Sequence, residues 1–135
     1  MTISILGSII AAVVSMAIGF AWYSDALFGK KWRREMGMGE NTVEEMKSSS
    51  MTGVMIGGFI TELVMAVILS FMIQVAGVFS VGQAMTLAFW IWLGFVATIQ
   101  FGSILWEKKS FTLYSINSLY RLVALLVMAI ILMVI

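Results

Sequence analysis

The sequence predicts an all-α integral membrane protein, a four-helix bundle formed by one transmembrane domain that covers residues 1–135. Hydrophobic residues make up 61% of the chain and charged residues 11%, whereas soluble domains carry about 25% charged residues. Four apolar segments each reach the roughly 20 residues that a helix needs to cross ~30 Å of hydrocarbon. These segments are residues 3–23, 52–78, 81–105 and 111–135.

The first segment is predicted to be a retained membrane helix rather than a cleaved signal peptide. Met1 and Thr2 supply no basic region ahead of it, whereas a signal peptide begins with one. The segment ends at Trp22 and Tyr23, and aromatic residues of this kind are typical of the membrane–water interface. We therefore expect this segment to stay in the membrane as the first helix of the bundle.

The loop at residues 25–50 is predicted to contain a short interfacial amphipathic helix. Phe28, Trp32 and Met36 recur at every fourth residue, and four cations lie between them, a pattern typical of a helix on an anionic membrane surface. The predicted membrane-surface residues are Phe28, Lys30, Lys31, Trp32, Arg33 and Arg34. Topology and anchoring are sufficient reasons for this basic cluster, and specific binding of a lipid or a partner is the alternative.

The rest of this loop carries two helix-boundary signals. Gly37 and Gly39 are expected to end the amphipathic helix, because glycine readily adopts the left-handed conformation that follows a helix. Thr42–Glu45 has the spacing of a capping box, in which a threonine and a glutamate bond to each other's backbone N–H groups. This box predicts a helical lead into the second apolar segment.

The loop cations predict the orientation of the chain. Seven cations lie in the loops at residues 25–50 and 107–110, namely Lys30, Lys31, Arg33, Arg34, Lys47, Lys108 and Lys109. The connection at residues 77–82 has none, so a four-helix topology places all seven on one side. By the positive-inside rule that side is cytoplasmic, which gives a multi-pass plasma-membrane protein with both termini facing out.

Small residues at every fourth position form rows on the first three segments. Lipid gives apolar helices no hydrophobic reason to associate, so close backbone approach through small residues becomes important. The predicted packing residues are Gly7, Ala11, Ser15, Gly19, Gly53, Gly57, Gly94 and Gly102. These rows predict a tight bundle, an oligomer, or both.

Glu62 and Arg121 are the only formal charges inside the apolar segments, and they mark a candidate polar centre. Each lies ten residues from the cytoplasmic end of its segment, which places both ~15 Å deep at 1.5 Å per residue. A charge at this depth costs about 2.5–3.5 kcal/mol on insertion scales, so it usually has a partner. An ion pair is geometrically possible, and Asn117 and Gln100 complete the predicted centre.

Three roles for this centre stay open. In the first, Glu62 and Arg121 neutralise each other and fasten two helices together in a structural or accessory subunit. In the second, Glu62 exchanges a proton, an ion or a substrate in a small transporter or channel, and Arg121 sets its affinity or holds an anionic group. In the third, one or both charges pair with another subunit.

The composition argues against an enzyme. The chain has no His and no Cys, so it lacks the usual general base, the thiol nucleophile and two common types of metal ligand. It has no glycine-rich phosphate loop, and its basic cluster is too small and too close to the membrane to indicate nucleic-acid binding. We expect no cofactor and no metal. The expected partners are membrane lipids together with copies of the chain or another membrane protein.

Several short stretches resemble the small bacterial membrane proteins of domain-of-unknown-function family 1761. The most specific stretch is Gly19–Tyr23, which is followed by Phe28–Trp32, and Leu93–Phe95 and Ile116–Asn117 also fit the pattern. The resemblance implies four membrane helices and a bacterial source, and it brings no established activity. Small multidrug-resistance transporters are similar in length, but their essential carboxylate lies in the first helix, where this chain has none.

Overall fold

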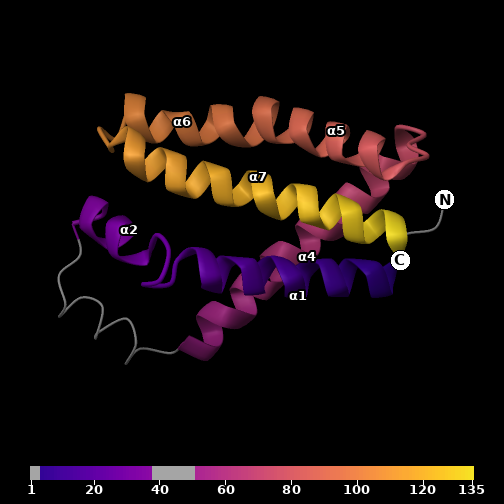
Figure 1. Ribbon diagram of the computed structural model, residues 1–135, viewed down its shortest axis with the longest axis horizontal. Coiled ribbons are helices and arrows are strands. Elements are labelled where there is room, and N and C mark those ends of the chain that lie inside the picture. Colours follow the sequence, from indigo (N-terminus) through magenta and orange to yellow (C-terminus); the bar gives the residue numbers. More distant parts are fainter. Residues whose placement is uncertain (1–3, 38–50) are drawn as a thin grey trace.

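The computed structural model describes residues 4–37 and 51–135, which form helices joined by short turns and include no strand (Figure 1). The helices are α1 (Ile5–Trp22), α2 (Gly29–Glu35), α4 (Met51–Val75), α5 (Val81–Ile91), the π-helix η1 (Trp92–Ala97), α6 (Thr98–Leu105) and α7 (Phe111–Val134). The predicted capping box Thr42–Glu45 lies outside the described residues, as do Gly39 and Lys47.

Within residues 4–37 and 51–135, four helical stretches are long and apolar enough to cross a membrane, as the sequence predicts. They cover Ile5–Trp22, Thr52–Val75, Val81–Leu105 and Phe111–Val134. The third stretch is not a uniform α-helix, because η1 forms its middle and separates α5 from α6. This π-helical interruption was not expected from the sequence.

Short-range hydrogen bonds set the helix ends. Ser4, Ser80 and Ser110 each accept a hydrogen bond from the backbone N–H three residues later, at 3.0, 3.2 and 3.0 Å, and so cap α1, α5 and α7. After α4 the backbone of Gly77 has φ +68°, and Val78 N–H donates to the carbonyl oxygen of Ile73 at 3.2 Å. This Schellman ending turns the chain toward α5.

The helices α1 and α7 run antiparallel, side by side, through the middle of the molecule (Figure 1). Helix α4 crosses them obliquely and packs chiefly against α1, whereas the stretch from α5 to α6 packs chiefly against α7. Contacts of α4 with α7 and α5 are much fewer. The arrangement is therefore less regular than the predicted four-helix bundle, because it has three strong seams rather than a closed ring of four.

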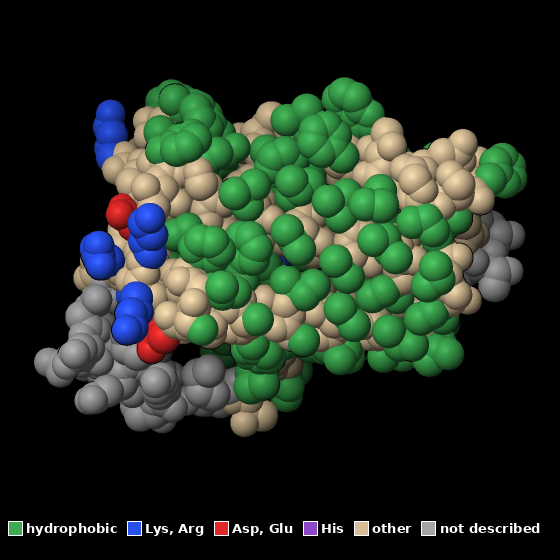
Figure 2. Space-filling view, viewed as in Figure 1, with side chains coloured by type: hydrophobic (Ala, Val, Ile, Leu, Met, Phe, Trp, Pro, Cys, Tyr) green, Lys and Arg blue, Asp and Glu red, His purple; other side chains and the backbone are tan. Residues whose placement is uncertain are grey.

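Charged side chains gather at one end of the molecule. Figure 2 shows Lys and Arg mainly at the left end, where Figure 1 places α2 and the turn between α6 and α7. The start of α1 and the end of α7 lie at the opposite end. The two described basic segments, which the sequence places on one side of the membrane, thus lie at the same end of the fold. Hereafter this end is called the basic end.

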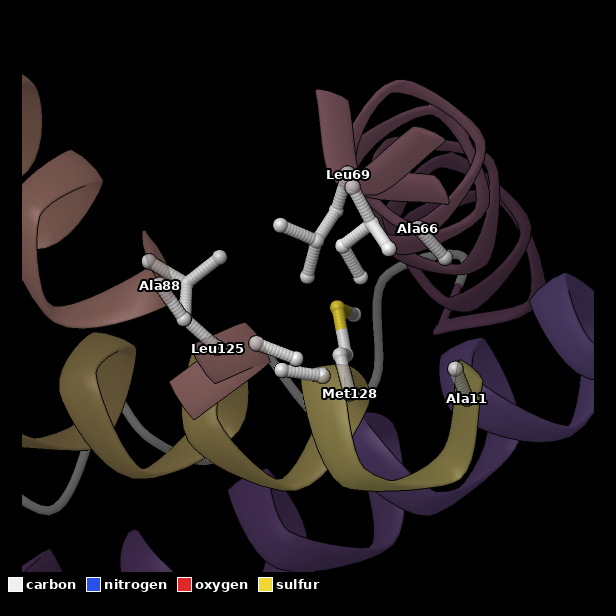
Figure 3. Packing of buried hydrophobic residues seen from close by; sticks show 9 residues of the cluster. Ala11, Ala66, Leu69, Ala88, Leu125 and Met128 are labelled. Carbon is white, nitrogen blue, oxygen red and sulfur yellow. The ribbon is translucent and has the colours of Figure 1, made fainter. Parts of the chain in front are cut away.

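The apolar core fills the half of the molecule away from the basic end. Met128 of α7 is fully buried, and Figure 3 shows it pointing toward Leu69 and Ala66 of α4, with Ala88 of α5 beside Leu125. The buried cluster consists of Ala11, Ala66, Leu69, Ile73, Ala84, Ala88, Leu125, Met128 and Ala129. Five of these nine residues are alanine, so the helices approach closely here, as packing in lipid requires.

The small-residue row of α1 is used inside the protein. Ala11 and Ser15 are buried, and a Cβ added at Gly19 would lie 2.9 Å from the hydroxyl oxygen of Tyr120. A Cβ at Gly7 would lie 3.6 Å from a Leu132 methyl and closer still to its own cap, Ser4. Small side chains along α1 therefore set how closely α7 can approach.

The rows on the other two helices are open. A Cβ added at Gly57 or Gly94 would meet no described atom within 4 Å, and Gly53 is exposed. At Gly102 a Cβ would meet Trp106 at an ordinary 3.7 Å. These four glycines are not packed against a neighbouring described helix; Gly57 and Gly94 face open space, and Gly102 borders a cavity between α6 and α7.

Helix α2 is present where the amphipathic pattern predicts a helix. It begins at Gly29, where any side chain would collide with the carbonyl oxygen of Tyr23. The ring of Phe28 lies 4.9 Å from that of Trp22, and the ring of Trp32 lies 5.7 Å from that of Tyr23. Two of the three apolar residues of the pattern, Phe28 just before α2 and Trp32 within it, thus contact the end of α1. The location of α2 on a membrane surface stays a prediction.

Candidate functional site

The carboxylate of Glu62 joins three helices. Its Oε1 accepts a hydrogen bond from Arg121 Nη1 of α7 at 2.6 Å, and its Oε2 accepts one from Ser15 Oγ of α1 at 2.8 Å. Glu62 itself lies on α4 and is 4% exposed. Both carboxylate oxygens are therefore bound within the chain, and the ion pair that matched depth made possible is present.

Tyr120 supports this junction from the side. Its hydroxyl donates to the backbone carbonyl of Ser15 at 3.0 Å, and its ring lies 4.9 Å from the guanidinium carbon of Arg121. The hydroxyl can approach α1 because position 19 is glycine, whose missing side chain leaves room for it. Tyr120 thus links α7 to α1 directly and places an aromatic face against the cation.

The two ends of the ion pair differ in exposure. The side chain of Arg121 is 25% exposed, and that of Glu62 is 6% exposed. A guanidinium carries five N–H donors, so the bond from Nη1 to Glu62 leaves further donors for other acceptors. Arg121 is therefore the more accessible member of the pair.

A cavity of about 320 Å³ reaches Glu62 between α1 and α4. Its walls are Met16, Gly19, Phe20, Tyr23, Gly58, Glu62 and Tyr120. Its lining extends from Glu62 to Tyr23, the residue that follows α1, so the cavity lies in the basic half of the molecule. Both carboxylate oxygens of Glu62 are thus hydrogen-bonded within the protein, and a cavity lies beside the residue.

A second set of polar contacts connects α1 to α7 nearer the basic end. The hydroxyl of Tyr23 donates to Asn117 Oδ1 at 2.7 Å, and the indole N–H of Trp22 donates to the carbonyl of Ile116 at 2.9 Å. The rings of Tyr23 and Tyr120 lie 5.5 Å apart. Asn117 is thereby connected to the Glu62 junction through two aromatic side chains.

The sequence of this chain matches one family of known proteins. A family model described as "Protein of unknown function (DUF1761)" matches residues 6–133. The chain belongs to the DUF1761 family. No curated protein and no solved structure matches it. The whole polar centre of this DUF1761 chain lies inside the matched region, including Ser15, Glu62 and Arg121.

Gln100 does not join the Glu62 junction of this DUF1761 protein. Its Oε1 is buried and has no hydrogen-bond partner among the described residues. It lines a separate cavity with Asn117, between α6 and α7. Of the four residues predicted to form one polar centre, Glu62 and Arg121 bond to each other, Asn117 connects through Tyr23, and Gln100 stands apart.

Sequence reasoning missed several members of the DUF1761 site. Ser15 was predicted as a small packing residue, and Tyr23 as an interfacial aromatic, whereas both donate hydrogen bonds to polar groups of other helices. Tyr120 was not singled out, although it is the neighbour of the one intramembrane cation. Its position beside Arg121 is the sequence signal that could have found it.

The geometry of the DUF1761 centre is suited to two roles. Its hydrogen bonds can hold three helices together, because the Glu62 carboxylate accepts from Ser15 of α1 and from Arg121 of α7. It can also receive a polar or charged group through the cavity beside Glu62, because a carboxylate can give up one partner for another.

Proposed function

We propose that this DUF1761 protein is a non-catalytic structural or accessory subunit of the bacterial plasma membrane. The observation that carries the proposal is the engagement of both Glu62 oxygens by residues of the two neighbouring helices. Truncating one partner of a buried pair typically costs about 3–5 kcal/mol, so such a junction fixes one packing of the helices. A fixed packing is what a subunit needs in order to present a defined surface to other proteins.

The proposed orientation has both termini outside and the basic end in the cytoplasm. The shared location of α2 and the α6–α7 turn at one end supports it, because cytoplasmic loops carry the excess of Lys and Arg. In this orientation α2 lies at the inner membrane surface, where its exposed cations Lys30, Lys31 and Arg34 can meet anionic lipid.

The proposed partners are copies of the chain or another membrane protein, in addition to lipid. Support comes from the open rows at Gly57 and Gly94, which allow another helix backbone to approach closely. Nucleic acid is not among the proposed partners, since the cations lie close to the proposed membrane surface.

Native mass spectrometry after gentle extraction from the source membrane tests this proposal. We expect a fixed-ratio assembly, either of this chain alone or with a second protein. Bulky variants Gly57→Ile on α4 and Gly94→Ile in η1 should reduce that assembly. Gly82→Ile, at an open glycine near the start of α5, serves as the matched control. A wild-type chain that is always a single subunit without protein partners would contradict the proposal.

A small transporter or channel is the second candidate, and the cavity beside Glu62 favours it. In this role a proton, ion or substrate enters from the basic end and exchanges with one of the partners of Glu62. Flux into proteoliposomes would be compared for wild type and Glu62→Asp, which keeps the charge but shortens the side chain. Flux that is the same with and without the protein would exclude this role for the species tested.

A further inference from the structure

A cavity of about 450 Å³ lies between α6 and α7 at the basic end, separate from the one that reaches Glu62. Its walls are Ile99, Gln100, Gly102, Ser103, Trp106, Glu107, Tyr114 and Asn117. These residues come from α6, from the turn that follows it and from the first two turns of α7. Gln100 lies five residues before the end of α6, so the cavity extends ~7.5 Å inward from that end.

Gln100, which lines the inner part of this cavity, carries an unsatisfied acceptor. Gln100 Oε1 is buried without a hydrogen-bond partner among the described residues, and such a group is costly unless a donor reaches it. Asn117, whose Oδ1 accepts from the Tyr23 hydroxyl, does not donate its amide N–H to this oxygen either. A ligand with N–H groups would satisfy Gln100.

The outer part of the cavity is acidic and aromatic. Glu107 is the only carboxylate in its walls, and Ser103 adds a hydroxyl oxygen between Glu107 and Gln100 along the chain. Trp106 supplies an aromatic wall, which attracts cations. A primary ammonium matches this set, because its three N–H donors can reach several acceptors and its charge opposes that of Glu107.

Two cations directly follow the acidic residue. Lys108 has φ +58°, a left-handed conformation that is uncommon for a residue with a side chain, and the backbone N–H of Lys109 donates to the carbonyl of Ser103 at 2.9 Å. Glu107, which lines the cavity, is thus followed at once in the chain by two lysines, Lys108 and Lys109. The sequence of charges is complementary to a zwitterion that carries an ammonium and a phosphate.

We propose that this cavity binds a phosphoethanolamine group, with its ammonium among Gln100, Ser103 and Glu107 and its phosphate at Lys108 and Lys109. The group belongs to an aminophospholipid of the surrounding membrane. The basis for this source is the apolar surface beside the cavity, where Ile99 is 74% exposed and Leu105 is 54% exposed and acyl chains can lie. A soluble phosphoethanolamine compound has the same headgroup chemistry and is the alternative source.

Binding is measured by native mass spectrometry of the purified, delipidated protein in detergent. The probes are short-chain phosphatidylethanolamine, phosphatidylcholine and phosphatidylglycerol, added one at a time, and phosphoethanolamine without acyl chains. We expect phosphatidylethanolamine to bind in a 1:1 ratio and roughly tenfold or more tightly than the other two lipids, as the loss of a charge-assisted hydrogen bond implies. Binding of phosphoethanolamine as tight as that of the lipid would support the headgroup site and assign it to the soluble source.

Two variants locate the site, and one serves as the control. Glu107→Gln removes the charge of an exposed turn residue, and Gln100→Leu removes the unsatisfied oxygen, so neither is expected to impair folding. Each should weaken phosphatidylethanolamine binding by about tenfold. Glu35→Gln makes the same charge change on α2 at the same end and should leave binding unchanged. Equal binding of all three lipids to wild type, or unchanged binding in both site variants, would overturn the proposal.

Discussion

Neutralising Glu62 should destabilise the protein far more than neutralising Glu35, a partly exposed acid of α2. Glu62→Gln keeps the shape and one acceptor oxygen but leaves Arg121 as an unpaired charge at membrane depth. Breaking a buried pair in this way costs about 3 kcal/mol or more. For a chain of 135 residues, at ~4 °C per kcal/mol, this loss corresponds to a fall in Tm of roughly 12 °C.

The assay is thermal unfolding in detergent, followed by tryptophan fluorescence, with Glu35→Gln as the matched control. The charge swap Glu62→Arg with Arg121→Glu should recover part of the lost Tm. Recovery is expected to be partial because Ser15 donates to a carboxylate in the wild type and would have to accept from a guanidinium in the swap. A Tm for Glu62→Gln equal to that of wild type would refute the reasoning that the pair holds the fold together.

Three further substitutions test the contacts around this junction. Gly19→Ala should lower the free energy of unfolding by about 1–3 kcal/mol, because its Cβ would push the Tyr120 hydroxyl away. Gly57→Ala, whose Cβ would meet no described atom within 4 Å, should change it by less than ~1 kcal/mol. Equal melting temperatures for the two variants would contradict this prediction. Ser15→Ala should cost about 1.5–3 kcal/mol by removing a hydrogen bond to a charged group, seen as a lower Tm that Ser15→Thr partly restores. Trp22→Phe keeps an aromatic ring but loses the indole donor to α7, so urea denaturation should show a loss of about 0.6–1.7 kcal/mol, and an unchanged midpoint would argue against this contact.

The helical architecture could be predicted from the sequence because it depends on local composition. Segment length and hydropathy are properties of consecutive residues, so the four spans were placed within three residues of their described ends. The depth of Glu62 and Arg121 follows from the rise of a helix, and that was sufficient to suggest their pairing. Ser80 and Ser110 could also have been recognised as caps, since serine before an apolar run is a known signal.

The sequence could not predict which faces of the helices contact one another. The small-residue row at Gly57 looks as suitable for packing as the row at Gly19. Only Gly19 faces another helix closely, because Tyr120 of α7 lies against it. Gln100 was grouped with Asn117 in one centre on the assumption of a regular α-helix, but the π-helix η1 precedes Gln100, and its wider turn alters the rotation of the residues that follow. Helix rotation and pairing are set by contacts across the whole fold, so they are not encoded in any one segment.

Four aromatic side chains donate to backbone carbonyls of neighbouring helices. They are Trp22 to Ile116, Trp92 to Ser118, Tyr114 to Ala97 and Tyr120 to Ser15. A carbonyl is present whatever side chain the receiving residue carries, so substitutions at the accepting positions leave these bonds in place and only loss of the donor removes them. A slide of one residue along a helix would move the carbonyl 1.5 Å and rotate it by about 100°, away from its donor. These hydrogen bonds therefore fix the axial position of each helix relative to its neighbour, and they do not depend on which side chain the accepting residue carries.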